Sequence, residues 1–227
     1  MSISLVLFDL DNTLIDRQSS LDSWVRHFST VRELPEPSAR IISDILRARA
    51  HPQDFVRVKL TLGLSDSVES LWRSYVSGMA QQVRCYDGVL GGLRSLKADG
   101  WSIGIATNGA PDIQYAKLDG AGLSELVDGV CASGEVGRRK PDRTVFEMAA
   151  RRCGARLADG GWMVGDNPST DMEGGRAAGL RTLWVYGEQQ WPEGVESPDV
   201  AVPDAQAAVG HLVQWGRTRS PQLSGAM

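Results

Sequence analysis

The stretch Ser4-Leu5-Val6-Leu7-Phe8-Asp9-Leu10-Asp11-Asn12-Thr13-Leu14 decides the fold of this chain. Its first five residues are almost all apolar and lack the alternation of polar and apolar positions that marks a half-exposed strand. They therefore predict a buried strand of a parallel sheet. Acidic, amide and hydroxyl side chains follow directly, and in an open α/β sheet ligands bind beyond the carboxyl ends of the strands. The stretch thus predicts both a central strand and the position of a site.

Four further apolar runs of this kind occur along the chain, followed by a weaker sixth candidate. They are Trp101–Ala106, Gly129–Ala132, Trp162–Val164, Thr182–Val185 and Asp199–Val202. Segments with helical spacing lie between them. Val89–Ala98 repeats leucine every three residues and stops at Asp99-Gly100, and Arg143–Cys153 follows a proline. Alternation of strand and helix implies right-handed crossovers. We predict an α/β fold with a doubly wound, Rossmann-like and mostly parallel sheet.

One interval breaks this alternation. Between the first strand and Asp87 lie about seventy residues without a strand signal, far more than a crossover needs. Helical spacing recurs there over four segments, Leu21–Phe28, Ala39–Ala50, Phe55–Leu62 and Val68–Met79. We predict a small α-helical domain over residues 17–84, inserted into a core made of residues 1–16 and 85–215. The polar stretch 216–227 is expected to be a mobile tail.

The overall charge excludes some classes of partner. Lys and Arg number 24 against 28 Asp and Glu, a formal net charge of −4, so no surplus of cations is available to bind nucleic acid or an anionic membrane. No stretch approaches the length of an apolar membrane span. The three cysteines share no metal-type or disulfide-type spacing, which favours free thiols in a reducing compartment. We expect a cytoplasmic protein, monomer or homodimer, with no nucleic-acid or membrane partner.

Aspartates gather at the expected carboxyl edge of the sheet. Asp9 and Asp11 follow the first strand, while Asp166 and Asp171 follow the fourth. At about 4 Å, each pair of these anions repels by roughly 4 kcal/mol at an effective dielectric near 20, so a bound cation is needed. Hard oxygen ligands with room for water and a phosphate oxygen favour Mg²⁺ over Zn²⁺ or a full Ca²⁺ cage. The sequence therefore predicts a Mg²⁺ site.

The same edge carries groups suited to phosphoryl transfer. Attack of a carboxylate on a phosphate ester brings two anions together, and Mg²⁺ with the ammonium of Lys140 would neutralise the phosphate oxygens. The hydroxyl of Thr107 and the backbone amide of Asn108 are further donors to the phosphate. A carboxylate nucleophile forms an aspartyl-phosphate, and a second aspartate protonates the leaving alcohol and then activates water. Each motif alone also fits an ordinary turn or helix entrance.

Together, Asp9-Leu10-Asp11-Asn12-Thr13, Thr107, Lys140-Pro141 and Gly165-Asp166…Asp171 resemble the four motifs of the haloacid dehalogenase superfamily, in the same order. The resemblance implies roles position by position. Asp9 would be the nucleophile and a metal ligand. Asp11 would be the acid/base and bind the metal through its backbone carbonyl, and Asp166 would be a metal ligand. Thr107 and Lys140 would bind the phosphoryl group. Asp171 would support the metal or Lys140 without being a direct ligand of the metal. The helical insert resembles the cap of phosphoglycolate-, sugar-phosphate- and nucleotide-phosphatase-like members.

These observations predict a Mg²⁺-dependent phosphatase that hydrolyses a small phosphomonoester metabolite through an aspartyl-phosphate. Two alternatives stay open: a phosphomutase of the same superfamily, and a non-catalytic binding or regulatory protein that keeps the fold. A dehalogenase is disfavoured because that chemistry needs no phosphate-binding Mg²⁺. The insert is basic at Arg47, Arg49, Arg57 and Lys59, and we single out Arg57 as the one expected to contact substrate. The histidines, at positions 27, 51 and 211, are interpreted as surface or packing residues.

Overall fold

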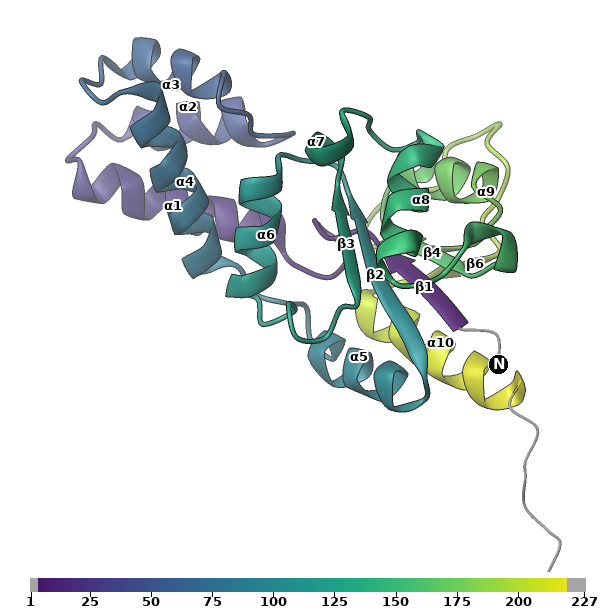
Figure 1. Cartoon of the computed structure of the whole chain (residues 1–227). Coiled ribbons are helices and arrows are strands. Elements are labelled where there is room, and N and C mark those ends of the chain that lie inside the picture. Colours follow the sequence, from purple (N-terminus) through teal and green to yellow (C-terminus); the bar gives the residue numbers. More distant parts are fainter. Residues whose placement is uncertain (1–3, 220–227) are drawn as a thin grey trace, which may run out of the picture.

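The core of the protein is a six-stranded sheet whose neighbouring strands are all parallel (Figure 1). The computed structural model describes residues 4–219. In the spatial order β3-β2-β1-β4-β5-β6, the sheet contains β1 (Ser4–Phe8), β2 (Trp101–Thr107), β3 (Gly129–Ala132), β4 (Trp162–Gly165), β5 (Arg181–Val185) and β6 (Val200–Val202). The predicted doubly wound α/β sheet is confirmed, including its sixth strand.

Helices cover both faces of the sheet, which explains why its strands lack polar alternation. Val6 and Phe8 point to one face, where α5 (Val89–Ala98) and α10 (Ala205–Arg219) bury their apolar side chains. Leu5 and Leu7 point to the other face, which α8 (Arg143–Arg152) covers. Because both faces are dry, most strand positions are apolar. The remaining helical segments of the core are α6 (Pro111–Gly120), α7 (Ser133–Val136), the 3₁₀ turn Leu157–Asp159, the π-helical segment Pro168–Glu173 and α9 (Gly174–Ala177).

The register of the sheet brings the carboxyl ends of three central strands to one edge. Phe8, the last residue of β1, pairs with Ile105 of β2 and with Val164 of β4. The polar residues that follow these strands therefore start from the same level of the sheet and come together in space.

Four helices between β1 and α5 form a separate helical layer, at the upper left of Figure 1. They are α1 (Arg17–Val31), α2 (Pro37–Leu46), α3 (Asp54–Leu62) and α4 (Val68–Gln82). Their apolar faces enclose one cluster rich in aromatic side chains, in which fully buried Phe55 packs against Trp24, Trp72 and Tyr75. The predicted helical cap is present, and these four helices are called the cap below.

The second cap helix ends earlier than predicted. α2 stops at Leu46, whereas the sequence indicated a helix that continues to Ala50. The buried guanidinium of Arg17, the first residue of α1, donates to the carbonyl oxygens of Leu46 at 2.8 Å and of Arg47 at 2.6 Å. These hydrogen bonds satisfy carbonyls at the helix end, which have no partner within the helix. Residues 47–50 then continue as a loop, called the cap loop.

Helix α6 joins the cap to the core. It packs along α4, and the two backbones approach so closely at Gly120 that a Cβ atom there would lie 2.0 Å from the carbonyl oxygen of Ala80. Trp72 of α4 donates its indole N–H to Asp112 of α6 at 2.5 Å, and Ile113 of α6 packs within the apolar cluster of the cap. α6 therefore contributes to both layers.

The chain stays helical beyond the predicted start of the tail. α10 continues to Arg219, so residues 216–219 are helical, and the rest of the predicted tail, 220–227, lies outside the described residues. Fully buried Leu212 and the close approach of Gly216 to Trp101 hold this helix on the core, a packing that the polar sequence after Trp215 did not indicate. None of the described helices combines the length and apolar character that a bilayer crossing requires.

Candidate active site

Three carboxylates meet at the carboxyl edge of the sheet. Asp9 follows β1, Asp166 follows β4, and Asp171 comes from the π-helical segment after β4; one oxygen of each lies within 4.8 Å of the others. Burial raises the pKa of Asp9 against the opposing charge of Lys140, and the charges of Asp171 and Asp166 add to the rise. Burial and the charge of Asp171 raise the pKa of Asp166 as well. Crowded, desolvated carboxylates of this kind are stabilised by a cation.

The donor set fits Mg²⁺. All three donors are carboxylate oxygens, and no imidazole or thiolate joins them, which is the ligand chemistry of a hard divalent ion. Elsewhere in residues 4–219 no comparable group of His, Cys, Asp or Glu occurs. Asp171 was expected to support the metal or Lys140 without direct metal ligation, but its carboxylate is part of the group of three. Metal ligation by the backbone carbonyl of Asp11 stays a prediction.

Lys140 supplies the positive charge within this group. Its Nζ lies 2.6 Å from Oδ1 of Asp9 and 2.6 Å from Oδ1 of Asp171, and its side chain is 1% exposed. Burial alone would lower the pKa of Lys140, but the charges of Asp171 and Asp9 raise it above the ordinary value. The ammonium therefore stays charged beside the predicted nucleophile.

Asn108 holds Lys140 in place. The Asn108 side chain accepts a hydrogen bond from the backbone N–H of Lys140 at 2.8 Å and donates to its carbonyl oxygen at 3.2 Å. The sequence predicts that the backbone amide of Asn108 binds substrate. The side-chain contacts do not test that role, so it stays a prediction. Thr107, the other predicted phosphate donor, is buried, and its Oγ1 accepts a hydrogen bond from Gln114 at 2.6 Å.

Asp11 does not belong to this group of three carboxylates and is held by helix α6. Both of its oxygens accept hydrogen bonds from Lys117 Nζ at 2.8 Å, and Gln114 Nε2 donates to Oδ2 at 3.3 Å. Burial would raise the pKa of Asp11, but Lys117 and then Arg17 bring it below the ordinary value. Asp11 is therefore ionised at neutral pH in this arrangement.

Sequence reasoning missed Lys117 and Gln114, although a signal exists. They lie three residues apart in a helix that begins directly after the Thr107 motif, so they share one helix face. Whether these two side chains face Asp11 depends on how α6 packs, and the spacing of residues in the sequence does not determine that packing.

A glycine makes room for Asp171. At Gly165, the last residue of β4, a Cβ atom would lie 2.3 Å from Oδ2 of Asp171. The same oxygen accepts the backbone N–H of Asn167 at 3.1 Å. The Gly-Asp pair of the fourth motif thus combines Asp166, a candidate metal donor, with the space that the Asp171 carboxylate needs.

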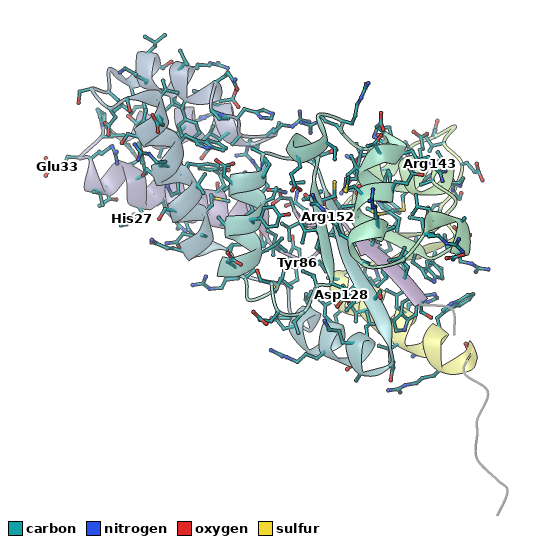
Figure 2. The ribbon with its side chains drawn as sticks, in the orientation of Figure 1. His27, Glu33, Tyr86, Asp128, Arg143 and Arg152 are labelled. Carbon is teal, nitrogen blue, oxygen red and sulfur yellow. The ribbon has the colours of Figure 1, made fainter. Side chains whose placement is uncertain are left out.

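A cavity of about 230 Å³ lies over these groups and extends to the cap. Besides the aspartates, Thr107, Lys117 and Lys140, its lining includes Arg17, Arg139 of the core, and Arg47 and Arg49 of the cap loop. Arg57, our predicted substrate contact, is exposed on α3 and does not line the cavity. That prediction is wrong because Arg57 lies on the exposed side of α3, opposite the face that buries its sequence neighbours Phe55 and Val58. His27 is exposed on α1, at the side of the cap away from the sheet (Figure 2).

Comparison with known families matches residues 6–185 to the haloacid dehalogenase-like hydrolases. The chain belongs to this family. The match runs from β1 to the end of β5, so it includes the cap and the carboxyl ends of β1, β2 and β4.

Curated relatives of the chain include phosphatases. A phosphoserine phosphatase from Thermus thermophilus is 41% identical over 112 residues, 49% of this chain and only 45% of that protein's length. A ribulose-1,5-bisphosphate 5-phosphatase from Halopiger xanaduensis is 28% identical over 223 residues, covering 89% of this chain and 92% of that protein.

Solved structures share the whole fold. The putative hydrolase YfnB from Bacillus subtilis, solved bound to magnesium, has a TM-score of 0.73 at 20% identity, with 93% of this chain and 99% of that chain covered. A putative beta-phosphoglucomutase from Thermotoga maritima has the same TM-score of 0.73 at 16% identity and covers 93% of this chain. At these identities the similarity concerns the fold.

Proposed function

We propose that the chain is a Mg²⁺-dependent phosphatase that hydrolyses a small phosphomonoester through a phosphorylated Asp9. The observation that carries the proposal is the grouping of Asp9 with Asp166, Asp171 and the ammonium of Lys140. Within the described part of the chain, Oδ1 of Asp9 binds Lys140 whereas Oδ2 accepts no hydrogen bond. A carboxylate oxygen is therefore free to attack phosphorus.

The residues divide the reaction into two displacements. In the first, Asp11 takes up a proton from solvent as substrate binds, a carboxylate oxygen of Asp9 forms a bond to phosphorus, the ester P–O bond breaks, and the leaving alcohol takes that proton from Asp11. In the second, Asp11 removes a proton from water, whose oxygen attacks the phosphorus of the aspartyl-phosphate and releases inorganic phosphate and Asp9. Lys140 stabilises the negative charge of the phosphoryl oxygens, and Thr107 is the nearby hydroxyl donor.

Asp9, Asp166 and Asp171 would hold the Mg²⁺, which when bound neutralises part of the charge that the phosphoryl group and Asp9 bring together. Asp11 has the ionised form that water activation requires, because Lys117 and Arg17 lower its pKa. The cavity, about 230 Å³, is smaller than the usual 300–1,000 Å³ of drug-sized ligand sites. These features favour a small phosphorylated metabolite as substrate.

The names of the relatives support a phosphatase without fixing the substrate. The substrates in these names are a phosphorylated amino acid, a sugar bisphosphate, pyrimidine nucleotides and glyceraldehyde 3-phosphate. Three free thiols, at Cys85, Cys131 and Cys153, fit the cytoplasmic location that we propose.

The test is hydrolysis of p-nitrophenyl phosphate with Mg²⁺ and after chelation by EDTA. We expect Mg²⁺-dependent release of phosphate that disappears in Asp9→Asn and persists in Asp87→Asn, a control at an exposed aspartate outside the cavity. Activity retained in Asp9→Asn would exclude Asp9 as the nucleophile. A wild type that is inactive on many phosphomonoesters would favour the binding or regulatory role. With a sugar phosphate as substrate, recovery of its isomer in place of inorganic phosphate would favour a mutase.

A further inference from the structure

The side chain of Gln114, in helix α6, joins three polar groups of the candidate site and is 1% exposed. Its carbonyl oxygen Oε1 accepts a hydrogen bond from Lys117 Nζ at 2.8 Å. Its Nε2 donates to Thr107 Oγ1 at 2.6 Å and to Asp11 Oδ2 at 3.3 Å. The reaction scheme above uses Thr107 and Asp11 but gives no task to the amide that lies between them.

The ammonium of Lys117 fixes which way the Gln114 amide faces. An ammonium has three N–H donors and no acceptor. All three are used here, two on the oxygens of Asp11 and one on Gln114, each at 2.8 Å. The atom of Gln114 that faces Lys117 must therefore be the carbonyl oxygen. The NH₂ group consequently lies at the other end of the amide, facing Thr107 and Asp11.

That orientation determines where the hydroxyl hydrogen of Thr107 can go. An amide NH₂ only donates, so Thr107 Oγ1 accepts from Gln114 and its own hydrogen must point elsewhere. No other group within residues 4–219 accepts that hydrogen. Thr107 is the last residue of β2 and lines the cavity together with Asp9. The hydrogen is therefore available to an anion that enters the cavity.

Gly109 provides the space that the amide needs. A Cβ atom at this position would lie 2.9 Å from both Cγ and Cδ of Gln114 and 3.2 Å from Oε1. A side chain at position 109 would therefore push the amide away from Thr107. Because Gly109 follows Thr107 by two residues, the strand end that carries the hydroxyl also leaves room for the side chain that orients it.

We propose that Gln114 is a positioning residue that directs the hydroxyl hydrogen of Thr107 toward the phosphoryl group. This inference rests on the proposed function, because the phosphoryl group is taken to lie beside Asp9. A hydroxyl without partners can rotate and present either its hydrogen or its lone pairs. With one lone pair held by Gln114, Thr107 is a preorganised donor, which needs no reorganisation when negative charge develops. Lys117 then serves two groups, since it anchors Asp11 and also sets the amide that orients Thr107.

The test is the binding of orthovanadate, an oxyanion shaped like phosphate, measured by titration calorimetry with the full chain in Mg²⁺. Its result does not depend on turnover. Gln114→Glu keeps the shape of the side chain but replaces the NH₂ donor by an acceptor, so Thr107 would turn its hydrogen toward the new carboxylate. We expect the Kd of vanadate to rise about 10–10²-fold, as for loss of a hydrogen bond to a charged group. Gln114→Met removes the amide without reversing the hydrogen bond and should raise the Kd about 3–10-fold.

A double-mutant cycle with Thr107→Val separates orientation of the hydroxyl from packing. If Gln114 acts through Thr107, Gln114→Met should change the Kd by less than about twofold once the hydroxyl is absent. Gln81→Met is the matched control, because Gln81 also donates to a hydroxyl, Ser77 Oγ at 3.5 Å, but is exposed on α4 and does not line the cavity. We expect the control to bind vanadate within about twofold of wild type, as for a surface substitution.

Three outcomes would each overturn the role of Gln114. They are a folded Gln114→Glu protein that binds vanadate within about twofold of wild type, an equal effect of Gln114→Met with and without the Thr107 hydroxyl, and no vanadate binding by the wild type. Absence of Mg²⁺-dependent p-nitrophenyl phosphate hydrolysis, with the effects of Gln114 on vanadate binding intact, would overturn only the proposed function.

Discussion

Replacing Lys140 by methionine tests the charge balance at the centre of the candidate site. Lys140 Nζ lies 2.6 Å from an oxygen of Asp9 and 2.6 Å from an oxygen of Asp171, and the side chain is 1% exposed. Methionine keeps much of the volume while removing the charge and both hydrogen bonds. The substitution therefore separates the electrostatic contribution of Lys140 from its packing.

The expected loss follows from these contacts. A fixed donor beside developing negative charge contributes about 10²–10³ in turnover, or about 2.7–4 kcal/mol, and we expect kcat to fall by that factor. Breaking a buried ion pair destabilises a fold by about 3–5 kcal/mol. Mg²⁺, when bound, would compensate the same carboxylates, and burial already favours protonation of Asp9, so we expect a smaller loss of about 1–3 kcal/mol.

The assay is steady-state hydrolysis of p-nitrophenyl phosphate in Mg²⁺, with thermal unfolding measured on the same samples. Lys97→Met is the matched control, because Lys97 also pairs with an aspartate, Asp128, at 2.9 Å. Asp128 precedes β3 at the amino edge of the sheet, away from the cap (Figure 2). We expect the control to keep kcat within about twofold, as for an exposed ion pair remote from the site. A folded Lys140→Met protein with kcat within about threefold of wild type would refute a catalytic role for the ammonium.

Three further predictions concern the acid/base, the metal and the cap. Lys117→Met removes the main anchor of the Asp11 carboxylate and should lower kcat by about 10–10² with little change in KM; an unchanged kcat would mean that Asp11 needs no anchor. Because the pKa values of Asp9 and Asp166 are raised in the metal-free fold, its stability should decline as pH rises through them. Mg²⁺ would replace the protons of Asp9 and Asp166, so the rise in Tm that Mg²⁺ causes should be larger at pH 8 than at pH 6. A rise independent of pH in thermal scans would contradict the proposed metal site. Phe55→Ala should destabilise the cap by about 3–5 kcal/mol, measured by urea unfolding, and a loss below about 1 kcal/mol would show that the aromatic cluster repacks.

The strands and the carboxylates were predictable from sequence for one physical reason. A strand buried on both faces has an unbroken apolar run, and the carboxyl ends of parallel strands share an edge. Because Asp9 and Asp166 each follow such a run, the sequence alone predicts that they lie close together, and the structure places them in one group. No packing detail was needed.

Contacts that depend on helix packing were not predictable in this way. Arg17 ends α2 at Leu46 by binding carbonyl oxygens about thirty residues away, so the helical periodicity to Ala50 was misleading. Lys117 reaches Asp11 from α6 only because α6 lies between the cap and the sheet. Arg57 was chosen from local composition, which does not show which face of α3 meets the cavity.

The position of α6 limits how this molecule can be recombined with its relatives. One face of the helix carries Lys117 toward Asp11, the proposed acid/base, while Ile113 and Asp112 pack on the cap. A chimera that exchanged residues 17–84 alone would place a foreign α4 against a helix that fits Ala80 at Gly120 without room for one extra carbon. Transfer of a cap, and of the substrate preference it carries, should therefore succeed only when residues 111–120 travel with it.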